Sequence, residues 1–276
     1  MTTTTDSKLK LLTKLFEHAK ILTTKELERQ GFSQDLIQWY RKSGWIKNLG
    51  RGAYCFQDSS CNLYDAICTL NSQTDFTLHF GGKTTLQEFY GISHFSLMKD
   101  SAKELFVDSE NKKLPSWFTG NFANEVLLRQ TDFLKSDNGI EDVEYQQKIL
   151  KVSSKERCFL ELLYSVPEMT TSVEAKEILE LLPTLRPKML QSLLENCSSV
   201  KVKRLFFYLS KKVNHSWLKY IDKDKIDLGS GVREIEKGGT FIKEFEIVVK
   251  EGEVNDSLEN ISNKLKNKDL VLVLNL

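Results

Sequence analysis

The sequence predicts an α+β protein: an N-terminal winged helix-turn-helix followed by a larger, mixed α/β C-terminal domain. Two observations place the winged helix: capping residues and glycine stops mark short helices, and a Gly-Arg-Gly turn between apolar strand patterns follows them. A third observation is that strand and helix patterns alternate irregularly beyond residue 94. With 276 residues there is room for two domains. We place the N-terminal region at 1–94, with the winged helix itself at about 7–57, and the C-terminal domain at 95–276.

The first two helices of the winged helix are marked by apolar spacing and by a capping box. Between residues 8 and 19, one helical face carries the apolar side chains Leu11, Leu12, Leu15, Phe16 and Ala19. Thr23 and Glu26 have the spacing of a capping box, which predicts that a short helix starts there. Gly31 is a natural residue for the end of that helix.

The third helix and the wing follow directly. Ser33 can cap a helix that buries Leu36, Ile37 and Tyr40 and ends at Gly44. Two strand patterns, at residues 45–49 and 53–56, then flank the tight turn Gly50-Arg51-Gly52. Three helices and a hairpin in this order are typical of a winged helix.

The rest of the chain alternates between helical and strand patterns. Capping boxes at Thr84 and at Ser153 predict the starts of two further helices. We predict helices at about 63–70, 84–90, 154–165, 172–182, 187–196 and 200–221, and strands at 76–80, 105–107, 126–128, 241–249 and 270–274, with a turn at 136–139.

Charge is distributed unevenly along a chain that is close to neutral overall, at +1. Up to Gln57, ten Lys and Arg face five Asp and Glu, so any surface for nucleic acid belongs in this segment. The polar N-terminus lacks the apolar core of a signal peptide, and no run is long and apolar enough for a membrane span. Five cysteines without CxxC spacing favour reduced thiols over disulfides or zinc, and we expect a cytoplasmic protein.

The third helix is the expected recognition helix for double-stranded DNA. With its apolar residues inward, it presents glutamine, which suits adenine, and arginine, which suits guanine. Lys47 and Arg51 on the hairpin would meet phosphates or an adjacent minor groove. The predicted DNA-binding residues are Ser33, Gln34, Gln38, Arg41, Lys42, Lys47 and Arg51.

Two glycine-rich stretches resemble nucleotide- or cofactor-binding loops, but their surrounding sequence does not fit those motifs. Gly81-Gly82-Lys83-Thr84 resembles a phosphate loop, yet the first glycine of that motif would have to stand where Thr77 is. The run at 227–231 resembles a methyltransferase loop, but too little chain follows it for a doubly wound domain. No metal-ligand spacing or nucleophile signature occurs, so we predict no catalytic residue, no cofactor and no metal site.

A basic, amphipathic helix near residues 199–222 leaves two interpretations open. The simpler one is a core helix with a solvated basic face. The other is a surface for antitoxin activity or for a second contact with nucleic acid, at Lys201, Lys203 and Arg204.

Most of the chain resembles the AbiEi family, the antitoxins of type IV toxin–antitoxin systems that act in abortive infection. The resemblance lies in the run from Leu22 to Leu27, in the wing from Gly44 to Tyr54 and in Gly81–Leu86. Its most distinctive block is Ser199–Phe206, followed by His215-Ser-Trp217 and Ile226–Gly231. The individual motifs are weak, but their order along the chain is specific.

The resemblance implies a non-enzymatic bacterial protein of phage defence with two activities. The winged helix would bind operator inverted repeats and repress its own operon, with a monomer in solution that binds DNA cooperatively. The C-terminal domain would counteract a nucleotidyltransferase-like toxin without a stable complex. Two alternatives stay open: a nucleotide- or RNA-processing enzyme that uses Gly81–Thr85, and an adaptor whose winged helix docks proteins.

Overall fold

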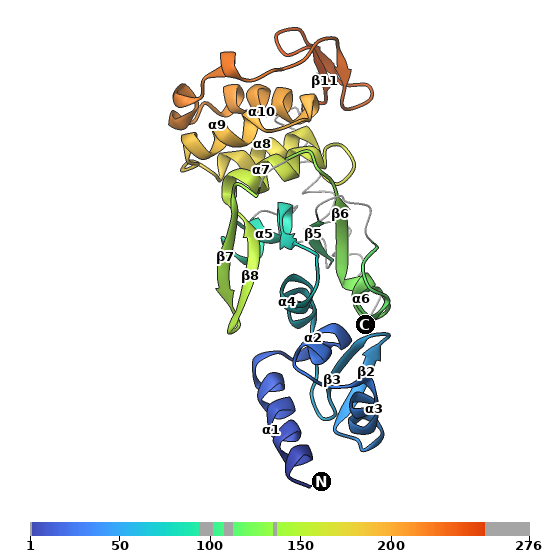
Figure 1. Cartoon of the computed structure of the whole chain (residues 1–276). Helices are drawn as coiled ribbons and strands as arrows, with labels where there is room; N and C mark the ends of the chain where they lie inside the picture. The colour runs from blue at the N-terminus through green and yellow to red at the C-terminus, as the bar shows by residue number, and fades with distance from the viewer. Residues whose placement is uncertain (1, 94–101, 108–112, 135–136, 252–276) are drawn as a thin grey trace, which may run out of the picture. The chain divides into compact units, whose positions relative to one another are not determined.

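The computed structural model describes residues 2–93, 102–107, 113–134 and 137–251. The chain forms two compact units, Met1–Cys158 and Phe159–Leu276 (Figure 1). Two predictions lie outside the described residues: the strand at 270–274 and the domain boundary between residues 94 and 95.

The first unit begins with the three helices and the hairpin predicted for residues 7–57, in the predicted order, and with one additional strand. They are α1 (Thr2–His18), β1 (Ile21–Thr23), α2 (Thr24–Arg29), α3 (Gln34–Lys42), β2 (Ile46–Gly50) and β3 (Ala53–Phe56). The strands form an antiparallel sheet in the order β1-β3-β2, and β1 was not expected from the sequence. One face of each helix contributes to a common core that includes Leu12, Leu27, Ile37 and Tyr40. The predicted stops at Gly31 and Gly44 have φ values of +79° and +76°, which favour glycine.

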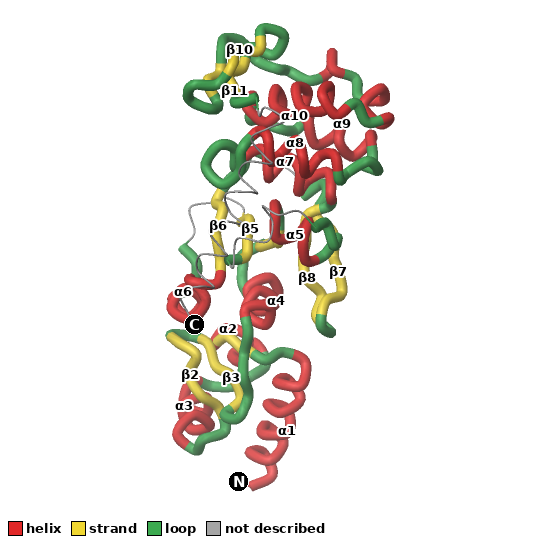
Figure 2. The backbone as a smooth tube through the Cα atoms, turned by 180° about the vertical axis from the view of Figure 1, so that it is seen from behind, coloured by secondary structure: helices red, strands yellow, loops and turns green. Residues whose placement is uncertain are grey.

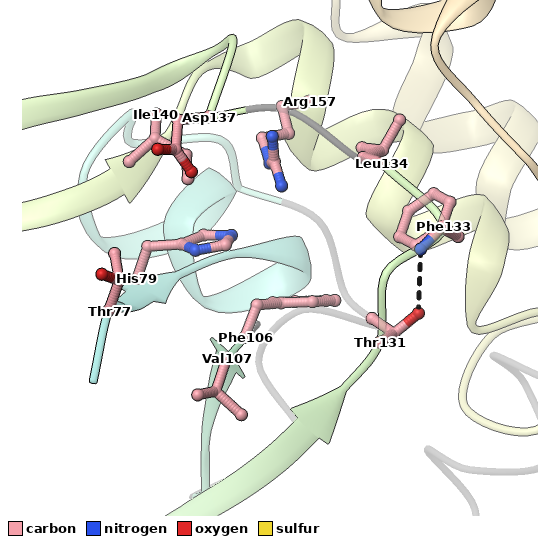
Figure 3. Close-up of a pocket in the computed structure, with 10 residues that line it drawn as sticks. All are labelled: Thr77, His79, Phe106, Val107, Thr131, Phe133, Leu134, Asp137, Ile140 and Arg157. Carbon is pink, nitrogen blue, oxygen red and sulfur yellow. Dashed lines mark hydrogen bonds between the residues drawn. The ribbon is translucent and has the colours of Figure 1, made fainter. Parts of the chain in front are cut away.

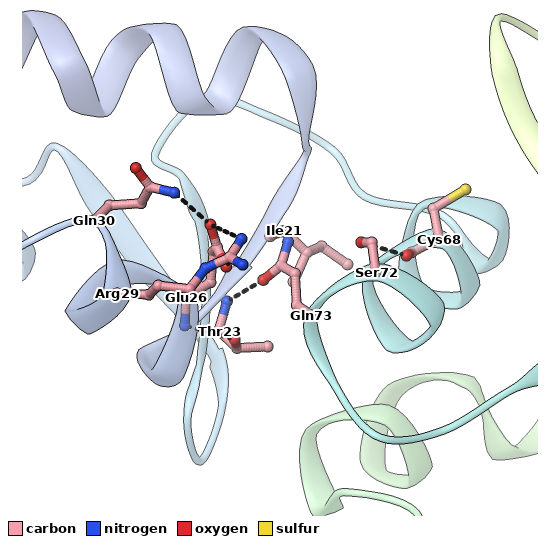
Figure 4. Close-up of polar contacts among 8 residues, drawn as sticks. All are labelled: Ile21, Thr23, Glu26, Arg29, Gln30, Cys68, Ser72 and Gln73. Atoms are coloured by element: carbon pink, nitrogen blue, oxygen red, sulfur yellow. Dashed lines mark hydrogen bonds and ion pairs between the residues drawn. The ribbon is translucent and has the colours of Figure 1, made fainter.

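The caps of the short helices combine local signals with contacts from far along the chain. The Ser33 hydroxyl accepts a hydrogen bond from the backbone N–H of Leu36 at 3.3 Å, as predicted for an N-cap. The Thr23 hydroxyl likewise accepts from Glu26 N–H, but the second half of the predicted capping box is replaced. The backbone N–H of Thr23 donates instead to Gln73 Oε1 at 2.8 Å, which ties β1 to the end of α4 (Leu63–Gln73) (Figure 4).

Beyond α4 the first unit contains a five-stranded sheet in the order β6-β5-β4-β8-β7 (Figure 2). Its strands are β4 (Leu78–Phe80), β5 (Lys103–Val107), β6 (Val126–Gln130), β7 (Ile140–Tyr145) and β8 (Lys148–Ser153). Two short helices, α5 (Gly82–Glu88) and α6 (Ser116–Phe122), accompany it, with a 3-10 turn at Ala123–Glu125. Ile21 and Ala53 of the winged helix share one core with Leu70, Leu105 and Val152, which makes this a single unit.

The second unit is mainly helical. The unit boundary falls within α7 (Lys155–Tyr164), and α8 (Ser172–Glu180), α9 (Pro187–Glu195) and α10 (Val200–Val213) follow. Two 3-10 helices, Ser216–Tyr220 and Lys223–Lys225, lead to a small sheet with the order β10-β11-β9, made of β9 (Arg233–Glu234), β10 (Thr240–Ile242) and β11 (Ile247–Val249). The helix predicted to reach residue 221 ends at Val213, because Asn214 adopts the left-handed conformation with φ +54°. Among the described helices, none has the length and apolar character required to span a membrane.

Candidate nucleic-acid interface

The outer face of α3 carries most of the polar side chains that the sequence assigns to DNA. Ile37 and Tyr40 are buried, which turns Gln38 to a half-buried position and leaves Arg41 and Lys42 exposed. Residues three and four apart lie on the same side of a helix, so these three polar side chains form one face. We call Gln38, Arg41 and Lys42 the α3 face. An amide, a guanidinium and an ammonium group together can read base edges and hold a phosphate.

Two further predicted residues at the start of α3 are engaged within the fold. The Ser33 hydroxyl caps the helix, as described above. The Gln34 side-chain amide donates to Glu28 Oε1 of α2 at 3.0 Å, although Gln34 itself is exposed. Ser33 therefore stabilises the start of α3, and Gln34 links α3 to α2, so base contact by Gln34 would require this hydrogen bond to open.

The wing presents its two predicted cations but is held at its tip. Lys47 and Arg51 are exposed, on β2 and at the turn that follows it. Asn121 of α6 donates from Nδ2 to the Leu49 carbonyl at 2.7 Å. Gly50 has φ +157°, and a Cβ atom at this position would lie 2.7 Å from the Trp117 Cα atom. The tip of the hairpin is thus packed directly against α6, and only glycine leaves room for this approach.

A cluster of polar contacts around Glu26 stabilises the end of α2 (Figure 4). Burial raises the pKa of Glu26, but hydrogen bonds from Arg29 and Gln30 outweigh it and keep the pKa below its usual value. Glu26 therefore stays ionised and ties together the last turn of α2.

Sequence reasoning did not assign three exposed side chains on the winged helix. Trp39 is 48% exposed on α3, with its ring edge against Tyr40, and Trp45 is 38% exposed beside Phe56. Lys25 is exposed in the first turn of α2. The sequence does contain a signal for Lys25, because the first helix of a helix-turn-helix crosses the DNA backbone. Nothing in the sequence alone indicated how far the two indoles are exposed.

The glycine-rich run at 81–85 holds a carboxylate of the protein itself. The Lys83 backbone N–H donates to Glu104 Oε2 at 2.6 Å, and the Glu104 backbone N–H donates to the Thr84 hydroxyl at 2.8 Å. A Cβ atom at Gly82 would collide with the same carboxylate. The predicted cap at Thr84 is wrong, because Gly81 is the N-cap and Thr84 lies inside α5. The position that a bound phosphate would take at this helix start is occupied by Glu104.

The three basic residues singled out on α10 are engaged within the second unit. Lys203 and Arg204 are 5% and 2% exposed. Lys201 Nζ donates to the carbonyls of Tyr164 and Val166 at 2.6 and 2.7 Å. The Arg204 guanidinium donates to the carbonyls of Leu228, Gly229, Gly231 and Glu246, and to the Glu246 carboxylate. Arg204 thus holds the 228–231 loop against α10, and Lys201 holds the end of α7 and the residues after it. We place no nucleic-acid surface there.

A cavity of about 130 Å³ lies in the first unit, beside the five-stranded sheet (Figure 3). Its polar lining includes the buried Arg157 and His79, and Arg157 donates to the Asn138 carbonyl at 2.9 Å. The His79 ring stacks on Phe106 with 5.6 Å between centroids. None of the predicted site residues lines this cavity.

Comparisons with known proteins place the chain in a family. Residues 102–250 match the profile of the AbiEi antitoxin, a transcriptional regulator of a type IV toxin–antitoxin system, and residues 5–97 match the profile of the AbiEi antitoxin N-terminal domain. No curated protein matches. The crystal structure of the RV2827C protein from Mycobacterium tuberculosis is similar in fold, with a TM-score of 0.55 at 12% identity over 87% of this chain and 89% of that chain. The protein described here thus belongs to the AbiEi family of antitoxins and transcriptional regulators of type IV toxin–antitoxin systems.

Proposed function

We propose that the winged helix binds inverted repeats in the promoter of its own operon and represses transcription. The observation that carries this proposal is the α3 face, in which Gln38, Arg41 and Lys42 point away from a well-packed core. The excess of Lys and Arg up to Gln57 supplies the positive potential that attracts a duplex. Lys47 and Arg51 on the wing would add contacts to the DNA backbone.

We propose that antitoxin activity resides in the C-terminal domain and is directed at a nucleotidyltransferase-like toxin. The family match over residues 102–250 supports this part. The protein would act without a stable toxin complex and as a monomer that binds neighbouring repeats cooperatively. Binding, rather than chemistry on a nucleotide, would account for both activities, and the carboxylate of Glu104 at the start of α5 supports this view.

The first experiment measures operator binding by fluorescence anisotropy. The full-length protein is titrated into a labelled fragment of its own promoter and into a scrambled fragment, at several salt concentrations. We expect tighter binding to the promoter, and an affinity that falls steeply with salt because phosphate contacts release counterions. Equal affinity for both fragments would refute sequence-specific repression.

A double variant and a matched control locate the contact surface. Gln38→Ala with Arg41→Ala should abolish the preference for the promoter fragment, because both base-reading groups of the α3 face are lost. The control is Lys151→Ala, which removes a cation of the same unit that pairs with Asp142 on β7. If the control and the double variant bind equally well, the α3 face is not the recognition surface.

The antitoxin part is tested by growth. The adjacent open reading frame is expressed as the toxin, together with the wild-type chain or with the Gln38→Ala, Arg41→Ala variant. Both chains should restore growth, because the substitutions leave the C-terminal domain intact. Loss of rescue in a variant that still folds would show that the two activities cannot be separated in this way.

A further inference from the structure

Two cysteines meet where the winged helix joins α4. Cys55 lies on β3, directly opposite Ile21 of β1. Cys61 comes just before α4, and its sulfur lies 3.5 Å from the carbonyl oxygen of Lys20, the residue before Ile21. The backbone N–H and the hydroxyl of Ser59 both donate to the Phe56 carbonyl, which folds the intervening segment back on itself. The Cys55 sulfur also lies 4.0 Å from the carbonyl oxygen of Lys47 on β2. Both sulfur atoms thus lie near the start of β1, close enough for each thiol to shift the pKa of the other.

The direction of the side chains on β3 agrees with this contact. Alternate residues of a strand point to the same face, so Cys55 shares a face with Ala53. Ala53 belongs to the core formed with α4 and the five-stranded sheet, and Cys61 packs against that same core. The thiols therefore approach each other from two separate segments of one core.

The surroundings of the pair make one thiol unusually acidic. The hydrogen bond from Cys61, helped by the charge of Lys47 and by Ser59, overcomes burial and lowers the pKa of Cys55 to about 7. The same hydrogen bond, together with burial and the charge of Asp65 on α4, raises the pKa of Cys61. The pair loses its first proton near neutral pH and shares a single negative charge.

The other cysteines lie in different surroundings. Burial raises the pKa of Cys68, and it raises that of Cys197 to about 11. Like the sulfur atoms of Cys55 and Cys61, those of Cys68, Cys158 and Cys197 lie near backbone carbonyls, so this contact does not distinguish the pair. Cys68 is half-buried like Cys61, so a comparison of these two separates the effect of the thiol pair from the effect of exposure.

We propose that Cys55 and Cys61 form an oxidation site, a dithiol that a peroxide converts into an intramolecular disulfide. The acidic Cys55 supplies the thiolate, and Cys61 keeps the shared proton. The Cys55 thiolate attacks the peroxide and breaks the O–O bond, which gives a sulfenic acid and, with hydrogen peroxide and a proton from solvent, one water molecule. The sulfur of Cys61 then displaces the sulfenic hydroxyl, which leaves with the Cys61 proton as a second water. In total, two thiols are oxidised to a disulfide and one peroxide is reduced to two waters.

The bond would join β3 to the segment that enters α4. Lys47, one of the wing cations, stands opposite Cys55 in the β2–β3 register, so the covalent link forms beneath the wing. The oxidation chemistry does not depend on DNA binding, and its test requires no DNA.

Peptide mapping tests the proposal on the full-length, reduced protein. After treatment with hydrogen peroxide, free thiols are blocked with iodoacetamide and the chain is cleaved with chymotrypsin. We expect peptides containing Cys55 and Cys61 to be joined, with a mass lower by two hydrogens, while Cys68 is recovered alkylated. Recovery of Cys55 and Cys61 as separate alkylated peptides, at a peroxide dose that oxidises Cys68, would overturn the proposal.

Rates and variants provide an independent check. At pH 7 the pair should react with iodoacetamide about fivefold faster than Cys68, because its thiolate fraction outweighs the lower nucleophilicity of an acidic thiol. Cys68→Ser should leave disulfide formation unchanged, and Cys61→Ser should abolish it. The proposal fails if the wild-type pair reacts no faster than Cys68, a measurement that does not depend on how any variant folds.

Discussion

The basic residues of α3 and those of α10 look alike in the sequence and have opposite roles in the structure. Arg41 and Lys42 of α3 are exposed next to a packed apolar side. Lys203 and Arg204 of α10 are buried, and Arg204 donates hydrogen bonds to four backbone carbonyls. A basic run on an amphipathic helix therefore does not identify a binding surface by itself.

The basic residues of α10 differ from those of α3 because distant segments of the chain supply hydrogen-bond acceptors to α10. The carbonyls around Arg204 belong to the 228–231 loop and to Glu246, all far along the chain from α10. Gly229, with φ +63°, lets this loop lie against Val200, where a Cβ atom would come within 2.8 Å of the valine side chain. The guanidinium thus serves to close a loop over the helix, a role that helical periodicity cannot indicate.

The largest expected effect is a loss of folding stability when the buried Arg204 of α10 is replaced. Arg204→Ala removes the hydrogen bonds that hold the 228–231 loop and a large buried side chain, so the free energy of unfolding should fall by roughly 3–5 kcal/mol. Arg41→Ala should change it by less than about 0.5 kcal/mol, because the residue is exposed. Thermal and urea unfolding of the two variants measures both changes. If the two variants were equally stable, Arg204 would not have the structural role that separates it from Arg41.

The next largest effect is a loss of DNA affinity when Arg41 of α3 is replaced. Arg41→Ala should cost about 1–3 kcal/mol of binding free energy, or about tenfold to hundredfold in affinity, because a bidentate contact to guanine is lost. The loss should disappear when the guanine in question is replaced in the operator. Anisotropy titrations against a set of single-base operator variants would show this, and a uniform loss across the set would contradict base readout by Arg41.

A smaller effect, on the salt dependence of DNA binding, should distinguish a phosphate contact by Lys42 from a base contact. Lys42→Ala should weaken binding evenly across sequences and reduce the slope of log affinity against log salt by about one. The slope is measured between low and moderate salt for wild type and variant. An unchanged slope would mean that Lys42 does not neutralise a phosphate.

The smallest effect comes from an exposed lysine at the end of α10. Lys211 pairs with Glu244 in solvent, so Lys211→Ala should alter the free energy of unfolding by at most about 0.5 kcal/mol. It should leave DNA binding unchanged. A loss of operator affinity in this variant would indicate that α10 does contact nucleic acid.

Local signals in the sequence were sufficient to predict the three N-terminal helices and the hairpin that follows them. Ser33 caps α3 through its nearest backbone neighbours, and the glycines at 31 and 44 end their helices with positive φ. These features depend on residues within one turn of each other. The inward face with Ile37 and Tyr40 then determined which side chains of α3 point outward.

Features held by distant residues could not be predicted in this way. The sequence analysis missed β1, whose pairing with β3 joins residues far apart in the chain, and the β7–β8 hairpin, whose turn at Gln146 and Gln147 uses positive φ without glycine. Glu104 reaches the start of α5 from the neighbouring strand, so the sequence of the glycine-rich run gave no sign of it. The same holds for the hydrogen bond that Gln34 donates to Glu28 of α2.

The contact between Gly50 and Trp117 has a consequence for how a duplex would be accommodated. A hairpin packed against α6 cannot swing to match a groove of variable width. If the winged helix binds operators as proposed, the DNA itself has to bend or narrow to meet Arg51. Sequences that deform easily near the wing, such as those with pyrimidine–purine steps, would then be preferred at positions that no side chain touches.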